Sequence, residues 1–232
     1  MTFGAIYTVN ASHFIPLAKH SIKSLMKVSD MPITVCCRDR WLKEFLDCDV
    51  SLQKISKKYL RPPEDAKKQE KPQWWFYCKF FSFRLMPYDI NIVIDADTEF
   101  LKDPRLTYKE GSDLSAALEY HADWENKKFF KLYDDTLNSG LMTYKKSEKI
   151  KNFFSAAEHH YVYENTNHYH ADQASINILL RGKFKNVIKI NVLDGKWNIR
   201  LPLISSTQNP YMLHAHHLDE PSFVEQESQK WQ

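Results

Sequence analysis

Short apolar runs alternate with amphipathic stretches over the first quarter of the chain. Residues 5–9 and 32–37 are apolar runs rich in strand-forming residues. Between them, residues 13–27 carry apolar side chains at helical spacing, with lysines on the opposite face. Residues 40–46 predict a short helix and residues 50–55 a third strand. Strands that alternate with helices in this way predict an α/β domain with a parallel sheet.

The same reading extends to the rest of the chain. An aromatic-rich segment at residues 73–86 has helical spacing, and residues 90–94 form a short run of mostly branched apolar residues, typical of a buried strand. Further strands or extended segments are predicted at residues 114–118, 187–192, 197–199 and 211–213, and residues 137–144 join a turn-prone triplet at 138–140 to another strand. Further helices are predicted at 147–163, with Ser147 as N-cap, and 174–180. We find no internal repeat. One α/β domain over residues 1–218 is expected, followed by a polar tail or linker at 219–232.

Two carboxylates directly follow the apolar run at residues 90–94. Asp95 and Asp97 stand two positions apart, and residues i and i+2 of an extended backbone point to the same side. Ligands of open α/β sheets bind at the carboxyl ends of the strands. Because two carboxylates aimed at one point repel each other, the pair predicts a divalent-cation site that holds a phosphorylated ligand. The alternative is an ordinary turn or helix cap, where aspartate is common.

Composition and charge narrow the class of protein. The 232 residues are 43% hydrophobic and 14% aromatic, enough for a sizeable core, and a net charge of +3 does not favour nucleic acid as the main partner. No segment predicts a signal peptide or a membrane span. The four cysteines have no zinc-site spacing, and the adjacent pair Cys36 and Cys37 is expected to be reduced and buried. We therefore expect a cytoplasmic protein, or one domain of a longer polypeptide.

Phosphate-binding candidates are few. No G-x-G-x-x-G follows the first predicted strand and no P-loop motif occurs, so dinucleotide and P-loop folds lack their phosphate cradle. Lys79 and Arg84 lie in the aromatic segment, and either could place its charge at the edge of the core beside a phosphate. Gly140, in the turn-prone triplet at residues 138–140, allows a close backbone approach.

Taken in order, several of these segments resemble the glycosyltransferases of the GT-A fold. The similarity is to the group that includes glycogenin and the bacterial galactosyl- and glucosyltransferases of lipopolysaccharide synthesis. The matching segments span nearly the whole chain: residues 6–10, Lys79, residues 88–98, Leu101, Pro104, residues 138–140, Asp172-Gln173 and His214. The resemblance implies a single Rossmann-like GT-A domain with a mixed, mostly parallel central sheet flanked by helices.

The resemblance also implies a reaction and its components. It implies a nucleotide-sugar donor, UDP-linked, a glycan or glycoprotein acceptor, and Mn²⁺ or Mg²⁺ as cofactor. Metal ligands would be Asp95, Asp97 and His214, with Asp95 alternatively on the donor ribose and His216 as the alternative histidine. Side chains near the nucleotide and donor sugar would be Tyr7, Thr8, Asn10, Lys79, Asp95, Ala96 and Gln173, and the catalytic group would be Asp172, Asn138 and Lys79. Asp172 is expected to lie closest to the reacting carbon.

One family feature is absent and three other readings stay open. The family often follows its late histidine with a glycine and a Lys-Pro-Trp, whereas here Ala215-His216-His217 follows His214, so the run lacks the glycine and the lysine of that diphosphate clamp. A D-x-D-x-T phosphatase would need Thr or Val where Glu99 stands. A sugar nucleotidyltransferase would need a Gly-rich basic loop after the first strand. A non-catalytic glycan-binding module would use the aromatic cluster near Trp74.

Overall fold

The computed structural model describes residues 1–60, 76–119, 136–164, 171–200 and 209–214. Several predicted features lie outside these residues. They are Trp74, the alternative metal ligand His216, and the polar tail at residues 219–232.

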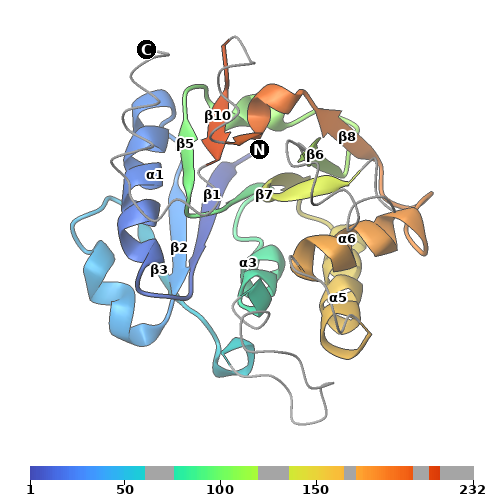
Figure 1. The fold of residues 1–232 in the computed structure, drawn as a ribbon, viewed down its shortest axis with the longest axis horizontal. Helices are drawn as coiled ribbons and strands as arrows, with labels where there is room; N and C mark the ends of the chain where they lie inside the picture. Colours follow the sequence, from blue (N-terminus) through green and yellow to red (C-terminus); the bar gives the residue numbers. More distant parts are fainter. Residues whose placement is uncertain (61–75, 120–135, 165–170, 201–208, 215–232) are drawn as a thin grey trace.

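A seven-stranded mixed sheet forms the centre of the protein (Figure 1). Four of its neighbouring strand pairs are parallel, and the strand next to the middle of the sheet runs antiparallel to both of its neighbours. This confirms the predicted α/β fold with a mostly parallel sheet. In spatial order the strands are β3 (Ser51–Lys54), β2 (Ile33–Cys37), β1 (Phe3–Val9), β4 (Ile90–Ile94), β7 (Leu137–Lys145), β6 (Leu114–Leu118) and β8 (Ile190–Leu193).

A second, three-stranded sheet carries part of the chain that follows the D-x-D pair. Its central strand is β10 (Met212–His214), which pairs antiparallel with β5 (Thr98–Phe100) and parallel with β9 (Ile199–Arg200). The register places His214 opposite Thr98, one residue after Asp97. A segment from the C-terminal end of the described chain is thereby brought back to the centre of the molecule.

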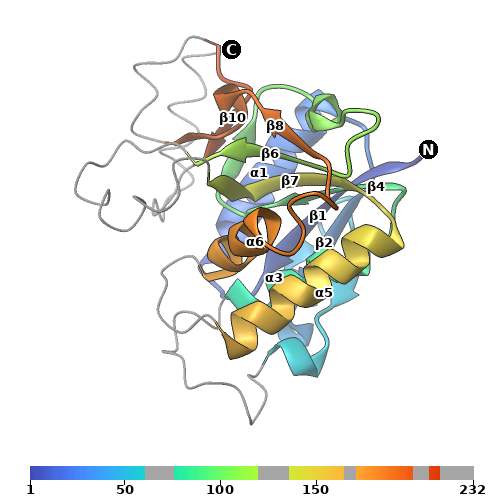
Figure 2. The same ribbon diagram turned by 90° about the vertical axis from the view of Figure 1, so that its right-hand side faces the viewer.

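Helices cover both faces of the large sheet (Figures 1 and 2). The helix α1 (Phe14–Val28) lies on one face, and α3 (Lys79–Leu85), α5 (Glu148–Tyr163) and α6 (Ala171–Arg181) lie on the other. Ser147 caps α5 as predicted, because its side chain accepts a hydrogen bond from the Ile150 amide. Short 3₁₀ helices are η1 (Asp39–Phe45), η2 (Lys57–Tyr59), η3 (Pro104–Thr107) and η4 (Gly195–Trp197).

Alternation along the strands divides the core in two. In β1, Ile6 packs with α3 and α5, whereas its neighbours Ala5 and Tyr7 pack with α1 on the opposite face. Strand β4 repeats the pattern, with Val93 on one face and Ile92 on the other. Strands buried on both faces account for the continuous apolar runs in the sequence.

Some local predictions were wrong in detail. Residues 39–45 form a 3₁₀ helix, Trp197 lies in η4, and the triplet at residues 138–140 belongs to strand β7. The triplet lies between Leu137, which pairs with β6, and Leu141, which pairs with β4, and its Gly140 carbonyl accepts from the Asp95 amide, so tertiary pairing overrides its turn propensity. Strand β5 was not predicted, because its buried residues Thr98 and Glu99 are polar and form no apolar run.

Two sequence-based expectations concern the cysteines and membrane spans. Cys36 and Cys37 are buried and free, and burial raises the pKa of the Cys36 thiol to about 12, so it remains an inert thiol at neutral pH. Among the described helices, none has the length and apolar character that crossing a bilayer requires.

Candidate active site

The turn between β4 and β5 brings the two carboxylates together. Residues 96 and 97 form a turn rather than the extended backbone that the D-x-D spacing suggested. The Thr98 hydroxyl donates to the Asp95 carbonyl at 2.9 Å, and the Asp95 amide donates to the Gly140 carbonyl at 2.8 Å. The turn is therefore fixed both within itself and against β7, and its position at the end of β4 agrees with the predicted ligand edge of the sheet.

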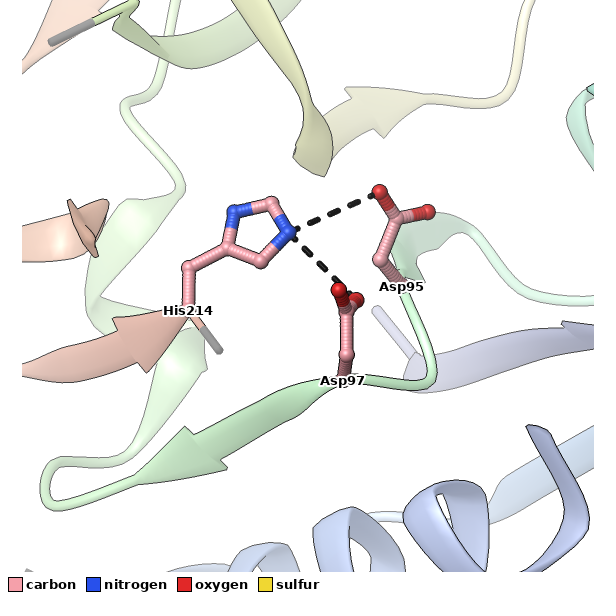
Figure 3. A group of neighbouring side chains, drawn as sticks. All are labelled: Asp95, Asp97 and His214. Atoms are coloured by element: carbon pink, nitrogen blue, oxygen red, sulfur yellow. Dashed lines mark ion pairs between the residues drawn. The ribbon is translucent and has the colours of Figure 1, made fainter. Parts of the chain in front are cut away.

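His214 completes a three-residue cluster with this pair (Figure 3). Its Nε2 lies 3.4 Å from Asp97 Oδ1 and 3.9 Å from Asp95 Oδ2. One ligand atom from each of the three side chains lies within 4.8 Å of the others, and within the described parts of the chain this is the one such group of acidic, histidine or cysteine side chains. Two carboxylate oxygens suit either Mg²⁺ or Mn²⁺, and the imidazole nitrogen favours Mn²⁺.

Burial and the neighbouring Asp97 carboxylate make Asp95 costly to ionise. Burial raises the pKa of Asp95, and although Lys79 and His214 lower it, the Asp97 carboxylate adds to the rise, so that the net direction is upward. A divalent cation between the two carboxylates would remove this cost, because its positive charge favours the ionised form of both.

Gly140 provides the space for the cluster. A Cβ at this position would lie 2.5 Å from His214 Cε1, 2.8 Å from Asn138 Oδ1 and 3.1 Å from Asp95 Oδ2. The backbone at Gly140 therefore makes the expected close approach, and the groups that it approaches are the side chains of His214, Asn138 and Asp95.

Gly140→Ala is expected to displace His214 and weaken Mn²⁺ binding, and to lower the free energy of unfolding by about 1–3 kcal/mol, as overpacking of a tight site does. A titration followed by the electron paramagnetic resonance of free Mn²⁺, with a parallel thermal melt, measures both. Gly111→Ala is the control. Its φ of +83° makes an alanine strained at this position, but no atom lies within 4 Å of the Cβ position, so this variant should lose stability without losing Mn²⁺ affinity. Equal Mn²⁺ affinity in the two variants would contradict the prediction.

Lys79 links the acidic pair to α6. Its Nζ lies 2.5 Å from Asp95 Oδ1 and 3.6 Å from Asp172 Oδ2, and it donates to the Ser139 hydroxyl at 3.3 Å. The Ser139 hydroxyl in turn donates to Asp172 Oδ2 at 3.1 Å. Burial lowers the pKa of Lys79, but Asp95 and Asp172 outweigh it and raise the pKa above its ordinary value, so the ammonium stays charged at neutral pH.

Arg84, the other basic candidate, faces elsewhere. Its Nη1 lies 2.6 Å from Glu158 Oε2 and 3.4 Å from the Tyr59 hydroxyl. These contacts tie α3 to α5, so the structure separates the two basic residues that the sequence left as alternatives.

A buried amide and carboxylate network adjoins Asp172. The Asn138 amide donates to Glu119 Oε2 at 2.6 Å and to Gln173 Oε1 at 3.3 Å, while the Gln173 amide donates to Glu119 Oε2 at 3.0 Å. The Ser139 backbone amide also donates to Gln173 Oε1, at 3.1 Å. Asn138, Asp172 and Gln173 are thus brought together as expected. Glu119 was missed, although a carboxylate directly after a predicted strand is the signal that singled out Asp95.

The residues expected at the nucleotide differ in how exposed their side chains are. Thr8 and Asn10, at the end of β1, are partly exposed, and the Thr8 hydroxyl is hydrogen-bonded to Ser82 on α3. Ala96 is buried within the turn. Tyr7 is fully buried, with its hydroxyl 3.0 Å from the Ser21 hydroxyl on α1, so its side chain packs in the core and does not line the site.

Comparisons with known proteins identify the family and the fold. No curated protein sequence matches the chain. Residues 85–221, more than half of the chain, match the family described as nucleotide-diphospho-sugar transferase. Solved structures with the same fold include the bifunctional glycosyltransferase WbbM (14% identity, TM-score 0.62), mouse xyloside xylosyltransferase 1 (12%, 0.58) and the galactosyltransferase LgtC in complex with donor and acceptor sugar analogs (10%, 0.58).

The extent of these matches differs. The alignments cover 95%, 94% and 91% of this chain in that order, but 46%, 98% and 86% of the other proteins. The chain thus spans about half the length of WbbM and nearly all of the xylosyltransferase. The chain belongs to the nucleotide-diphospho-sugar transferase family and has the GT-A glycosyltransferase fold.

Proposed function

We propose that the protein is a metal-dependent glycosyltransferase that moves a sugar from a nucleotide-diphosphate sugar, UDP-linked, to a glycan or glycoprotein acceptor. The observation that carries this proposal is the convergence of Asp95, Asp97 and His214 at the ligand edge of the sheet. The family match favours transfer over the phosphatase, nucleotidyltransferase and glycan-binding alternatives.

Asp95, Asp97 and His214 would hold Mn²⁺, or Mg²⁺ in its place. The donor set fits such a cation, because two carboxylate oxygens and one imidazole nitrogen converge there, and the pairing of His214 with Thr98 joins the strand that carries the histidine to the turn that carries the carboxylates. When bound, the cation neutralises the charge that builds on the departing nucleoside diphosphate. Thr8 and Asn10, at the end of β1, would contact the base and ribose.

Lys79 would supply a fixed positive charge on the donor side of the site. Its raised pKa keeps it protonated, and its contacts with Asp95 and Asp172 hold it in place before any ligand binds. A preorganised charge of this kind needs no rearrangement during the reaction.

Asp172 would be the carboxylate closest to the reacting carbon. It is only 2% exposed, and the Ser139 hydroxyl and the Lys79 ammonium hold one of its oxygens. Glycosyl transfer passes through an oxocarbenium-like state, and an oriented carboxylate stabilises the positive charge on the sugar. The amides of Asn138 and Gln173, already ordered by Glu119, would bind hydroxyl groups of the donor sugar.

A thermal-shift panel tests the donor and the cation together. A nucleotide sugar at about a hundred times its Kd should raise the stability by about 2.7 kcal/mol, which corresponds to an increase in Tm of about 5–10 °C for a chain of this length. The shift is expected with UDP-sugars and Mn²⁺, and not with Mn²⁺ plus the sugar 1-phosphate, or with the UDP-sugar in excess chelator. A shift of the same size in chelator would contradict the metal assignment.

We further propose a cytoplasmic location and a place in a longer polypeptide. A chain that covers 46% of a bifunctional glycosyltransferase is compatible with further domains in a longer polypeptide. The buried free thiols support a cytoplasmic location.

A further inference from the structure

The metal-facing histidine is held on its other ring nitrogen by a buried asparagine. His214 Nδ1 lies 2.9 Å from Asn198 Oδ1. Asn198 is 1% exposed and stands between η4 and β9, where its backbone N–H donates to the Gly195 carbonyl at 2.9 Å. Strand β9 begins at the next residue and pairs with β10, so the backbones that carry the two side chains are fixed relative to each other.

A second hydrogen bond sets which way the Asn198 amide faces. Its Nδ2 donates to the backbone carbonyl of Leu118 at 3.3 Å, at the end of β6. The nitrogen therefore faces Leu118 and the oxygen faces His214. Because an amide oxygen only accepts hydrogen bonds, the proton between the two residues must belong to His214 Nδ1.

The position of this proton decides what His214 offers on its other side. A neutral imidazole that carries its proton on Nδ1 has its lone pair on Nε2, and Nε2 is the atom that faces Asp95 and Asp97 (Figure 3). That lone pair would be unfavourable against two carboxylates alone, whereas it is the third ligand for a cation placed among them. Metal-binding histidines are commonly oriented through their other nitrogen in this way.

We propose that Asn198 is a positioning residue that keeps His214 in the Nδ1–H tautomer and aims Nε2 at the divalent cation. The inference rests on the proposed metal-dependent function. It assigns Asn198 a role outside the ligand set, acting through His214. It also makes the aim of His214 depend on the packing of both sheets, since Asn198 is held by Leu118 of the large sheet and faces β10 of the small one.

Asn198→Leu tests the proposal by removing the oxygen and the nitrogen of the side-chain amide at nearly constant shape. We expect its affinity for Mn²⁺ alone, measured by the electron paramagnetic resonance of free Mn²⁺, to fall by about tenfold to a hundredfold. Asn198→Asp keeps an oxygen opposite His214 Nδ1 and is expected to bind Mn²⁺ close to the wild-type affinity. If the leucine variant does not fold, Asn198→Ala is titrated under the same criterion.

Asn91→Leu is the matched control for general destabilisation. Asn91 is also fully buried, and its amide makes two hydrogen bonds to the backbone of Tyr88 at the opposite end of β4 from Asp95. It should lower Tm without changing the Mn²⁺ affinity.

Three results would overturn the role of Asn198: an unchanged affinity in Asn198→Leu, an equal loss in Asn91→Leu, or a loss in Asn198→Asp as large as that in the leucine variant. A wild-type protein that binds no Mn²⁺ at all would instead overturn the metal-dependent function on which the inference rests.

Discussion

Asp97→Asn should abolish metal-dependent sugar transfer, with a loss of at least about a thousandfold in kcat/KM. The substitution keeps the shape of the side chain but removes one of two carboxylates within reach of His214 Nε2. A bound cation contributes several kcal/mol of charge stabilisation, and each 1.36 kcal/mol corresponds to a factor of ten in rate. Initial rates measured across a Mn²⁺ titration, with the donor that gives the largest thermal shift, provide the test.

The same variant should fold at least as well as the wild type when no metal is present. Asp95 and Asp97 repel each other in the metal-free site, and removal of one charge relieves that repulsion. Asp103→Asn is the control. Asp103 caps η3 and pairs with Arg105 outside the cluster, so transfer should persist in that variant. Transfer that survives in Asp97→Asn, or that proceeds unchanged in chelator, would show that the D-x-D pair does not hold the cation.

Lys79→Met is expected to lower both activity and stability. Removal of the ammonium takes away the cation that contacts both Asp95 and Asp172, and the loss of one member of a buried ion pair costs about 3–5 kcal/mol. Because Asp95 is 30% exposed, we expect a smaller decrease in the free energy of unfolding, about 2–4 kcal/mol. Turnover should fall by about a hundredfold or more, as for other preorganised charged donors.

The effect of Lys79 should depend on pH and on metal in a defined way. The pKa of Lys79 is raised on folding, so its contribution to stability is complete below the unfolded value of about 10.4 and is lost as the pH rises through the folded value. Mn²⁺ bound at the proposed site would supply a replacement charge beside Asp95. It should therefore raise Tm more in Lys79→Met than in the wild type.

Arg84→Met separates this role from the general loss of a basic residue on α3. Arg84 pairs with Glu158 away from the cluster, so its removal should lower stability while the turnover of the folded protein stays unchanged. Equal losses of turnover in the two variants would indicate that α3 contributes packing only, and would remove Lys79 from the site.

Local patterns were sufficient where the forces are local. The run at residues 90–94 is buried on both faces, and its composition alone predicted β4. The helix at 147–163 was predicted with its cap, because Ser147 and the periodic apolar residues lie within a few turns of each other. The carboxylates that follow β4 could be found in the same way.

Contacts between distant segments decided the rest of the site. Glu119 meets Asn138 and Gln173 across separations of 19 and 54 residues, and His214 meets Asn198 through the pairing of β9 with β10. No short-range pattern encodes these distances. The convergence of the D-x-D carboxylates also came from a turn closed by Thr98, and not from the extended backbone that their spacing suggested.

The sequence by itself determined the alternation of strands and helices, the acidic pair at the end of β4, and the set of segments that resemble a nucleotide-sugar transferase. These depend on neighbouring residues and on composition. Only the tertiary structure decided that Lys79 rather than Arg84 faces the acidic pair, that the Tyr7 side chain packs in the core, and that Asn198 meets the ring of His214. Each of these outcomes depends on which side of an element meets another part of the chain, and the packing of two sheets and their helices sets that relationship.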